Sequence, residues 1–465
     1  MCLDLRYPNS QTAWARFKLA TLLNTLPHEL RQGDIIFTDD LDSAYHSVMM
    51  HEDTWPYMCF DSPLGLVCPT VLSFGDGLAP FIFSKITRPI TAFCHVIGLR
   101  IMSYLDDFPW MALRENADST KRFAQWLMPA LGWISNTAKA DWSMGSVKES
   151  LGFVVDAEAM RLRVPADKIS TICDLITEAL GGPVTNVGLV HSIWGKIVSL
   201  RPALQGASAY CYETGRQIVE ERAKGKEGPD LMTLSQASRD ELGMLKIHIA
   251  KWGPVGLPIP NTSQQIEVWS DAGEVGYGGH LGPAGPGDEH SGVLPPELIG
   301  ASSTRRELYA IRKTAIALGD RIRGKRVLFH VDSRASVFNM LNQGGSIREL
   351  NTAYREWIQT CEDLRIEAYY AWLPREENVR ADKLSKRVPL SWALSSLAAE
   401  TVQKGFPDTA VTLPDLNQIA NTICAAQREG RNLLLVHPVW PASAWWKKIV
   451  SLGVRAWIFP GQIFL

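Results

Sequence analysis

Short apolar segments that end in acidic residues recur along the chain, and they define most of the elements that its pattern predicts. Residues 34–42 (DIIFTDDLD) predict a strand that runs into a turn, and residues 101–108 (IMSYLDDF) predict a strand, a tight turn and a second strand. Two adjacent carboxylates repel each other unless a cation lies between them, so Asp106 and Asp107 at such a tip favour a divalent metal site. For this pair taken alone, the alternative is a solvated surface turn.

Between these segments, the spacing of apolar residues predicts further helices and strands. Residues 17–30 place leucines at a roughly helical spacing, residues 151–156 and 160–165 predict two short strands, and residues 167–250 are mainly helical in pattern. The Pro- and Gly-rich residues 252–261 predict a linker and a domain boundary.

Four acidic residues follow this linker, each in a different predicted element. Asp271 and Asp332 end strands, and Asp382 stands at the start of a late helix. Ser and Thr residues at 302–304 predict the cap of another helix, in which Glu307 lies one turn from the start. The order is strand, strand, helix, strand, loop, helix. A single Asp at a strand end is commonly only a turn residue, so this order is what makes the four informative.

Composition is that of an ordinary folded protein. The chain has 465 residues, 46% hydrophobic and 21% charged, which allows roughly two to four domains with cores of their own. The net charge of −2 gives no global attraction to a polyanion. Binding of nucleic acid would therefore need local basic faces, such as residues 321–326.

The cysteines and the hydropathy bear on the compartment. Eight single cysteines without a Cys-x-x-Cys pair predict neither a zinc motif nor a disulfide framework, so a reducing compartment is the default. Cys59, in an apolar setting, is expected to be a small core residue. No apolar run reaches transmembrane length and the first residues lack a signal-peptide core. We therefore expect an intracellular protein, cytoplasmic or nuclear, that has no membrane partner.

The part of the chain before the linker resembles the palm of a reverse transcriptase. Asp40 precedes Leu41 and Tyr45 at the offsets of the family motif, and residues 104–107 (YLDD) match the motif that follows later in the family. Between them, Phe74-Gly75 and then residues 79–83 resemble the loop and helix under the templating base pair. The resemblance implies an α+β right-hand polymerase palm in 31–165, preceded by partial fingers in 1–30 and followed by a helical thumb and linker in 166–260.

The resemblance also implies roles for the acids. Asp40, Asp106 and Asp107 would bind two Mg²⁺ ions, with Mn²⁺ as the alternative, one ion activating the primer 3′-hydroxyl and one accompanying the pyrophosphate. Asp39 and Asp42 stand close by; only Asp40 has the offsets of the motif, and Asp42, on the same strand face, is the second choice.

Four further residues are expected to contact the substrate. Tyr45 falls where the family excludes a ribose 2′-hydroxyl, although a buried strand-end tyrosine is the plain alternative. Gly75 belongs to the loop of the middle motif, and Lys139 falls where the family approaches the triphosphate, although an isolated Lys after a turn is usually solvated. Residues 4–9 (DLRYPN) resemble the end of the fingers, where a strand carries an Asp-x-Arg-x-x-Asn pattern that includes Arg6; a surface salt pair is the alternative.

Two departures from the family pattern stand in this region. Asp76 follows Phe74-Gly75 where a hydrophobic residue is usual, and Pro109 is expected to interrupt the strand after the Asp-Asp turn. The basic residues that clamp the triphosphate in the family would lie before residue 1.

After the linker, Asp271, Glu307, Asp332 and Asp382 resemble the four-carboxylate site of ribonuclease H. The resemblance implies an α/β domain in 261–390 that binds two Mg²⁺ ions and cuts the RNA strand of an RNA/DNA hybrid, recognised through 2′-hydroxyls and helix shape. Residues 375–377 (REE) occupy the region where several ribonucleases H carry a His, so no residue is assigned to help product release.

Residues 391–465 form a small C-terminal region. Residues 433–448 resemble, less closely, the segment after ribonuclease H in DIRS-type retrotransposons, which encode a tyrosine recombinase and carry a degenerate methyltransferase-like domain at this place. A few strands and helices with Trp as core are the alternative. No glycine-rich cofactor loop is present, so methyl transfer is not expected.

Together, the resemblances imply an RNA-directed DNA polymerase with ribonuclease H activity that corresponds to a segment of a retrotransposon polyprotein; whether a longer parent chain exists is left open. Its partners would be an RNA template, a DNA primer, deoxynucleoside triphosphates and an RNA/DNA hybrid. Two alternatives stay open: an inactive retroelement remnant that at most binds nucleic acid, and a protein in which only the ribonuclease H site works. The seven carboxylates favour the enzyme, whereas the absent clamp, Asp76 and Pro109 favour the remnant.

Overall fold

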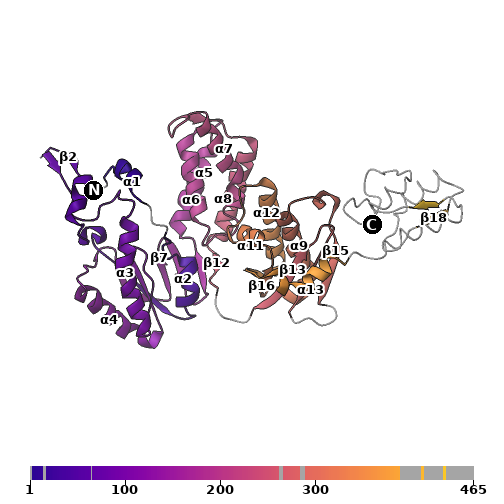
Figure 1. Ribbon diagram of the computed structural model, residues 1–465, viewed down its shortest axis with the longest axis horizontal. Coiled ribbons are helices and arrows are strands. Elements are labelled where there is room, and N and C mark those ends of the chain that lie inside the picture. Colours follow the sequence, from indigo (N-terminus) through magenta and orange to yellow (C-terminus); the bar gives the residue numbers. More distant parts are fainter. Residues whose placement is uncertain are drawn as a thin grey trace. The chain divides into compact units, whose positions relative to one another are not determined.

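The computed structural model describes residues 3–13, 17–63, 65–260, 265–282, 288–387, 410–412 and 433–435. Contacts divide the chain into a first unit, Met1–Gln264 with Asn342–Arg355, and a second unit, Gln265–Leu341 with Glu356–Leu465 (Figure 1). In the described part of the chain, no helix combines the length and apolarity that crossing a membrane requires.

An antiparallel sheet in the order β4-β5-β1-β6 organises the start of the first unit. Its strands are β1 (Ile35–Asp40), β4 (Arg100–Ile101), β5 (Asp107–Ala112) and β6 (Asp141–Gly145). β1 and β5 pair along their whole length, with Asp40 opposite Asp107. Successive strand side chains point to opposite faces. Phe37 and Trp110 therefore lie on one face, and Asp40 and Asp107 on the other.

Two helices cover the face that carries Phe37 and Trp110. They are α3 (Ala79–Val96) and α4 (Ala117–Ala130), whose buried residues belong to the same hydrophobic cluster as that face. In α3 the buried positions Phe83, Thr87, Ile90 and Cys94 recur every three or four residues, which gives the helix one apolar side. Pro80 lies in the first helical turn, where its missing N–H costs nothing.

The opposite face of the sheet joins a larger hydrophobic cluster, which includes Ile36 and Met111 and extends through the rest of the unit. A second sheet, in the order β12-β9-β8-β7, contributes to this cluster. Its strands are β7 (Val147–Ser150), β8 (Phe153–Asp156), β9 (Arg161–Arg163) and β12 (Leu257–Pro258). The helix α2 (Leu22–Glu29) adds Leu22 and Leu26 to it, and the flanking Leu30 completes the contact.

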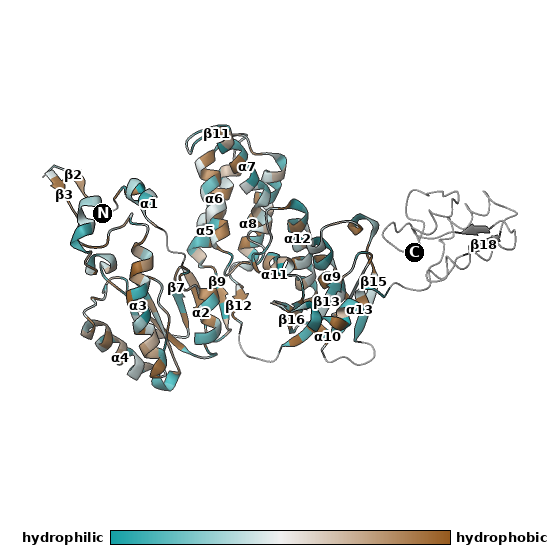
Figure 2. Ribbon diagram, viewed as in Figure 1, coloured by the Kyte–Doolittle hydropathy of each residue, from teal (hydrophilic) through white to brown (hydrophobic). Residues whose placement is uncertain are grey.

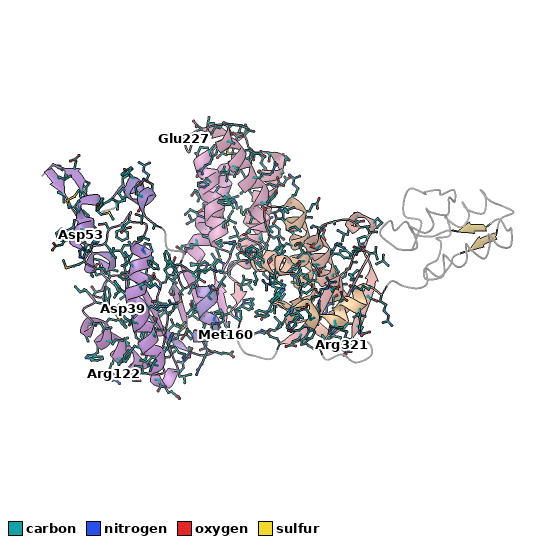
Figure 3. All side chains as sticks on the ribbon, in the orientation of Figure 1. Asp39, Asp53, Arg122, Met160, Glu227 and Arg321 are labelled. Atoms are coloured by element: carbon teal, nitrogen blue, oxygen red, sulfur yellow. A yellow bond between two sulfur atoms is a disulfide. The ribbon has the colours of Figure 1, made fainter. Side chains whose placement is uncertain are left out.

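Four helices follow, as the periodicity of residues 167–250 predicts. They are α5 (Ala166–Leu180), α6 (Val187–Ser199), α7 (Tyr212–Ala223) and α8 (Gln236–Trp252). The side chains of Asn186 and Ser235 accept hydrogen bonds from backbone N–H groups in the first turns of α6 and α8 and so cap these helices. Hydrophobic and hydrophilic residues are mixed along these helices (Figure 2). Glu227, labelled in Figure 3, lies in the loop after α7.

Shorter elements complete the first unit. They are α1 (Arg6–Gln11), the 3₁₀ helices η1 (Ala44–Ser47), η2 (Glu52–Tyr57), η3 (Arg114–Asn116) and η4 (Ala209–Cys211), and the strands β2 (Phe60–Ser62), β3 (Gly65–Val67), β10 (Thr185–Asn186) and β11 (Leu231–Met232).

Two predictions at the N-terminal end need correction. The strand expected in residues 4–9 is the helix α1, because Asn9 is tied by side-chain hydrogen bonds to the loop at Gly75 and Gly77 and no strand lies beside it to pair with among the described residues. The helix expected over residues 17–30 begins only at Leu22, because Thr21 caps it: its hydroxyl accepts the N–H of Asn24.

The strand β5 continues through Pro109, contrary to the prediction that this residue interrupts it. Thr38 lies opposite Pro109 in the ladder, and the Pro109 carbonyl accepts the N–H of Met102 on the other side. The N–H and C=O of a strand residue point the same way, so the donor that Pro lacks is missing on the side of the short β4 and not on the side of β1.

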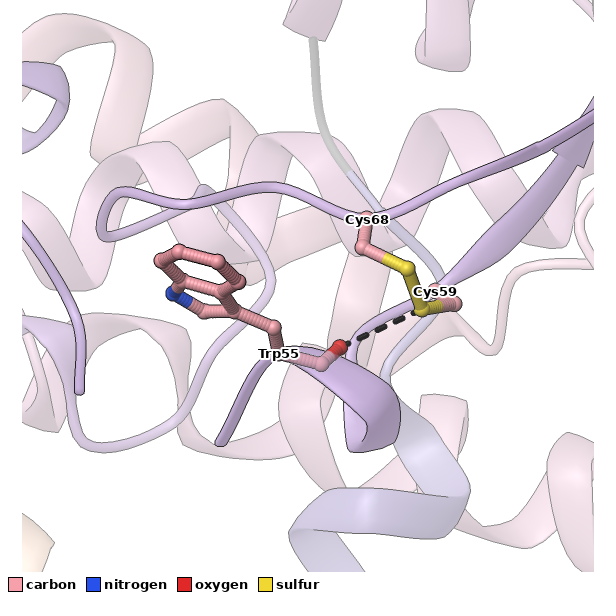
Figure 4. The surroundings of a disulfide bond; sticks show 3 residues. All are labelled: Trp55, Cys59 and Cys68. Carbon is pink, nitrogen blue, oxygen red and sulfur yellow. Dashed lines mark hydrogen bonds between the residues drawn. A yellow bond between two sulfur atoms is a disulfide. The ribbon is translucent and has the colours of Figure 1, made fainter. Parts of the chain in front are cut away.

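Cys59 and Cys68 form a disulfide, with 4.1 Å between their Cα atoms, so the prediction of no disulfide is wrong (Figure 4). The hairpin of β2 and β3 pairs Phe60 with Val67, which makes the two cysteines the next facing pair. Cys59 is half-buried beside the Trp55 carbonyl and is not a core residue as expected. The hairpin register brings the two sulfurs together, and no short cysteine motif announces it.

The second unit is built on a mixed sheet in the order β15-β14-β13-β16-β17. β13, β16 and β17 are parallel, and β14 and β15 are antiparallel to their neighbours. The strands are β13 (Ile266–Ala272), β14 (Gly276–Leu281), β15 (Glu289–Val293), β16 (Arg326–Val331) and β17 (Glu367–Trp372).

Helices cover both faces of this sheet. α9 (Ser303–Ala317) packs against Gly279 through Thr314, and α13 (Val379–Ser385) packs against Gly278 through Leu384. Adjacent strand residues face opposite ways, so α9 and α13 lie on opposite faces, and a larger side chain at either glycine would displace a helix. The remaining elements are η5 (Pro296–Leu298), α10 (Gly319–Ile322), α11 (Arg334–Leu341), α12 (Arg348–Leu364), η6 (Arg375–Glu377), β18 (Ala410–Thr412) and β19 (Leu433–Leu435).

Candidate carboxylate centres

A tight turn places the adjacent acids of the first unit. The Tyr104 and Asp107 backbones exchange hydrogen bonds of 2.9 and 3.0 Å, so Asp106 stands in the turn and Asp107 opens β5. Leu105 closes the turn in the left-handed region, at φ 53°, which costs roughly 1–2 kcal/mol for a residue other than glycine. The Asp106 carbonyl accepts the N–H of Leu41, which ties the turn to the end of β1.

Asp40 and Asp107 are direct partners across the two strands, which places their carboxyl groups on the same face of the sheet. Burial, followed by the charges of Asp106 and Asp40, raises the pKa of Asp107 to about 6. Burial also raises the pKa of Asp40, which is 8% exposed. Burial disfavours the charged form of both carboxyl groups, and a bound cation would favour it.

The neighbouring acids face elsewhere. Asp39 (labelled in Figure 3) points to the face covered by α3 and α4, where it is buried and accepts a hydrogen bond of 3.0 Å from the Ser135 hydroxyl. Asp42 is exposed after the end of the strand. Of the three acids at 39, 40 and 42, the one chosen from the motif is therefore the one that lies beside Asp107.

Tyr45 and Gly75 lie near this centre. The Tyr45 ring is held between Phe74 and Phe83, with centroid distances of 5.0 and 5.4 Å, and burial followed by the Asp106 charge raises the pKa of its hydroxyl. Gly75 has φ 107°, and a Cβ there would overlap the Leu3 carbonyl. The backbone position therefore needs glycine both for its φ and for its space.

Asn9 is a residue to which the sequence assigned no role. Its amide donates to the Gly75 carbonyl at 2.8 Å and accepts the Gly77 N–H at 2.9 Å, so one side chain fixes the loop that precedes α3. The signal was present in the sequence, since Asn9 closes the Asp-x-Arg-x-x-Asn pattern.

The two predicted basic residues differ in placement. Lys139 lies with its Nζ 3.9 Å from Asp40 Oδ1 and has a largely exposed side chain, so the structure brings it to the centre. Arg6 pairs with Asp4 at 2.6 Å on the surface, in the plain arrangement left open above. Such an exposed pair contributes little to stability.

Asp271, Glu307 and Asp332 meet in the second unit, with one carboxylate oxygen of each lying within 4.8 Å of the others. β13 and β16 are adjacent and parallel, so their carboxyl ends place Asp271 and Asp332 at the same edge. Ser302 caps α9 by accepting the Arg305 N–H, and Glu307 follows in the next turn. The Ser385 hydroxyl donates to Asp271 and orients it.

Glu307 carries the strongest electrostatic signal of the second unit. It is 5% exposed, and its Oε2 has no hydrogen-bond partner in the described chain. Burial, followed by the charges of Asp271 and Asp332, raises its pKa well above the usual range, and burial raises that of both aspartates. A hard divalent cation prefers such oxygen ligands, so these residues fit a metal ion.

Asp382, the fourth predicted acid, lies outside this group of three. Its two oxygens are bound by Arg375 at 3.1 Å and by Lys386 at 2.6 Å, and Lys386, ahead of Arg375, lowers its pKa. Asn378 holds the preceding loop by donating to the Ser270 carbonyl. The sequence shows the acid but not the two cations, which depend on how η6 and α13 fold.

A cation and an aromatic ring stand beside Asp332. The Arg334 guanidinium lies 4.0 Å from the centroid of the Trp372 ring, and the Trp372 indole N–H donates to the Asp332 carbonyl at 2.9 Å. Arginine stacked on an aromatic ring keeps its N–H groups for a phosphate. Neither residue was predicted from the sequence.

Among the described residues, the triad of the second unit is the one set of three acidic, His or Cys side chains whose ligand atoms come this close. In the first unit, Asp40 and Asp107 are together, whereas Asp106 stands at the turn without completing such a group. A metal ion there would have to draw the Asp106 side chain in.

No family model and no curated protein matches the sequence. Solved structures of a foamy viral protease-reverse transcriptase are similar to it. A dRH form with double-stranded DNA has 17% identity and a TM-score of 0.49, over 80% of this chain and 63% of that one. A complex with an RNA/DNA hybrid has 16% sequence identity and a TM-score of 0.49, and the match covers 79% of this chain and 48% of that one. Another complex with double-stranded DNA has 18% identity and a TM-score of 0.47, and the match covers 79% of this chain and 74% of that one.

This chain thus spans 63% of the length of the first of these proteins and 48% of the second. With TM-scores of 0.49 and below, the likenesses assign neither a fold nor an activity to it. The case for function depends on the carboxylate geometry.

Proposed function

We propose that the chain is an RNA-directed DNA polymerase joined to a ribonuclease H, from a retrotransposon polyprotein. The observation that carries the proposal is that each unit gathers carboxylates at adjoining strand ends, and that each group contains a buried oxygen without a hydrogen bond in the described chain, Asp40 Oδ1 and Glu307 Oε2. Phosphoryl transfer needs little more than positioned charge, so paired acids on fixed strands suit it.

The proposed domains follow the sequence boundaries. Residues 31–165 are the palm, 166–260 the thumb and linker, 1–30 partial fingers, and 261–390 the ribonuclease H domain. The proposed subgroup, DIRS-type elements with a tyrosine recombinase, depends on residues 433–448, which lie outside the described residues except for β19. The methyltransferase-like reading of 391–465 lies outside them in the same way.

In the proposed palm, some residues would bind the metal ions or the triphosphate, and others would shape the nucleotide pocket. Divalent ions, Mg²⁺ first and Mn²⁺ as the alternative, would activate the attacking oxygen and neutralise the leaving group at both centres when bound. Asp40 and Asp107, with Asp106 turned in, would hold them. Lys139 carries a positive charge to the side of Asp40 where a triphosphate would lie, and the clamped Tyr45 ring would fill the space of a ribose 2′-hydroxyl.

In the second unit, Asp271, Glu307 and Asp332 would hold the ions, with Asp382 as the fourth ligand. Ser385 fixes the rotamer of Asp271, and the parallel strands fix the spacing of the two aspartates. Arg334, which lies over the Trp372 ring, would bind a phosphate of the RNA strand beside Asp332. The proposed partners are accordingly an RNA template, a DNA primer, deoxynucleoside triphosphates and the hybrid that they produce.

A paired assay on the whole chain tests the proposal. Primer extension on an RNA template and cleavage of a labelled RNA/DNA hybrid are each measured with Mg²⁺, for the unchanged chain, for Asp106→Asn and for Glu307→Gln. We expect Asp106→Asn to abolish extension and spare cleavage, and Glu307→Gln to do the reverse. Loss of both activities in both variants would contradict two independent centres.

A ribonuclease H without polymerase activity is the second candidate. It is favoured by one observation, that only the second unit brings three acidic oxygens within 4.8 Å of one another in the described residues. Cleavage without extension in the paired assay would select it. A folded chain with neither activity would select the inactive remnant.

A further inference from the structure

The fourth acid of the second unit is already neutralised by the protein. Asp382 has one oxygen on Arg375 and the other on Lys386, so both sides of its carboxylate are in use. Two of the other acids are held differently: Glu307 has an oxygen without a hydrogen-bond partner in the described chain, and Asp271 accepts a hydrogen bond from the neutral Ser385 hydroxyl. The acid beside the group of three is therefore paired with two cations of the protein.

Arg375 and Lys386 hold Asp382 in different ways. Lys386 follows Asp382 by four residues on the same short helix end, which is a local pair. Arg375 comes from η6, in a loop that is anchored by the buried Asn378 amide on the Ser270 carbonyl, next to Asp271. Its side chain is 70% exposed, and its positive charge also interacts with Asp332 and Asp271. Because the Arg375 side chain is largely exposed, its guanidinium can move away from Asp382 without unfolding the surrounding structure.

We propose that Arg375 is a built-in competitor for one of the two divalent ions: it occupies Asp382, so the centre binds a first ion on Asp271, Glu307 and Asp332, and a second only when Arg375 releases Asp382. This inference rests on the ribonuclease H proposed above. It assigns a positioning residue to the loop in which no helper for product release was found. Arg375 controls how many ions the centre holds at a given concentration.

Substrate would shift this competition. A phosphate of the RNA strand offers Arg375 a partner as good as a carboxylate, because a guanidinium binds both with paired N–H groups. Release of Asp382 would then coincide with arrival of the hybrid, and its return would favour loss of an ion after the cut. The arrangement links occupancy of the centre to the presence of substrate.

The test is a calorimetric titration of Mn²⁺ into the full chain that carries Asp40→Asn and Asp106→Asn, which silences the first centre. The parent is expected to bind one ion tightly and a second more weakly. Arg375→Gln should tighten the second ion about tenfold, because it removes one full charge a few ångströms from the ligand at a solvent-exposed site. Arg375→Lys, which keeps the charge, should resemble the parent.

The matched control is Arg387→Gln, which removes the same charge close to Asp382 in sequence from a side chain that pairs with Glu289. It should leave the second affinity unchanged. In a background of Asp382→Asn, Arg375→Gln should have a smaller effect, because the guanidinium then acts only through its charge on Asp332 and Asp271.

The outcomes separate the two proposals. Equal second affinities in Arg375→Gln and Arg387→Gln, or two equally tight ions in the parent, would overturn the role of Arg375 while hybrid cleavage upholds the ribonuclease H. No Mn²⁺ binding in any variant would overturn both. If Arg375→Gln bound the second Mn²⁺ more tightly but the chain did not cleave the RNA/DNA hybrid, the competition between Arg375 and the ion would stand and the ribonuclease H proposal would be rejected.

Discussion

Asp40 and Asp107 lie directly opposite each other in the β1–β5 ladder, and the charge of Asp40 is one of the causes that raise the pKa of Asp107. The pair is mutually repulsive once both are ionised, and burial adds to the cost. Without a bound cation, this pair of buried acids therefore lowers the stability of the fold. At this cross-strand pair, the arrangement that would bind a metal ion is also one that lowers the stability of the metal-free fold.

Replacing Asp107 by Asn should make this conflict visible. We expect the metal-free chain to gain about 1–2 kcal/mol in free energy of unfolding, since a repelled charge is removed, while primer extension is lost. Urea unfolding in EDTA and an extension assay measure the two effects. The exposed Asp42 supplies the matched change: Asp42→Asn should alter neither, and loss of extension there would move the assignment from Asp40 to Asp42.

Asn9 should affect substrate affinity more than turnover. Asn9→Ala removes both hydrogen bonds to the loop of Gly75 and Gly77, each worth about 1 kcal/mol, and loosens the residues that precede α3. We expect the KM for deoxynucleotide to rise about tenfold with a smaller change in kcat. Ser10→Ala, which removes a hydroxyl bonded to the Tyr7 carbonyl within the same helix, is the control. A lowered kcat at unchanged KM would contradict a loop-positioning role.

Tyr45 should set the choice of sugar. The ring is immobilised by Phe74 and Phe83, so it cannot move aside for a 2′-hydroxyl. Tyr45→Val should allow incorporation of ribonucleotides, whereas Tyr45→Phe, which keeps the ring, should not. Single-nucleotide extension with matched ribo- and deoxynucleotides gives the ratio, and an unchanged ratio in Tyr45→Val would remove Tyr45 from the pocket.

Local patterns explain how much of the fold was predictable. Patterns among neighbouring residues predict the strands that end in acids, the helices of residues 167–250 and the Ser302 cap. The structure confirms these elements. The turn at Tyr104–Asp107 was predicted for the same reason, although its left-handed residue is Leu105. The roles of the site residues and the domain boundaries stay predictions.

What escaped the sequence depends on residues distant in the chain. The Asn9 contacts join segments 66 positions apart, so no local pattern could show that the strand expected there is a helix. The capture of Asp382 by Arg375 needs the fold of η6. Pro109 was expected to break a strand because the direction of its missing donor cannot be read from its neighbours.

The Cys59–Cys68 disulfide predicts a difference between reduced and oxidised chain. It closes a short loop around the β2–β3 hairpin, so reduction should lower the stability of this hairpin by roughly 2–3 kcal/mol. Alkylation followed by mass measurement should show two more reactive thiols after reduction. Hydrogen exchange should then quicken in β2 and β3 and stay unchanged in α5 to α8. Equal thiol counts before and after reduction would exclude the bond.

His280, which is buried, and His290, which is half-buried, should make the stability of the second unit depend on pH. Burial, followed by the charge of Arg380, lowers the pKa of His280, and burial, followed by Lys313, lowers that of His290. Unfolded imidazoles have a pKa of 6.5, so below that pH the unfolded chain binds more protons than the folded one. The stability is therefore fully present above pH 6.5 and is lost as the pH falls through the lower folded pKa.

Hydrogen exchange of β13 and β14 at pH 7.5 and pH 5.0 measures this loss. His280 stacks on Trp269 with a centroid distance of 5.1 Å, and His280→Phe keeps the stack while it removes the titrating group. We expect the variant to lose less stability than the unchanged chain between the two values, by about 1 kcal/mol. His51→Gln, at an exposed imidazole of the first unit, is the control. If His280→Phe and the unchanged chain lost the same amount, the pH dependence would have to come from other imidazoles of this unit, His290 and His330, whose pKa burial also lowers.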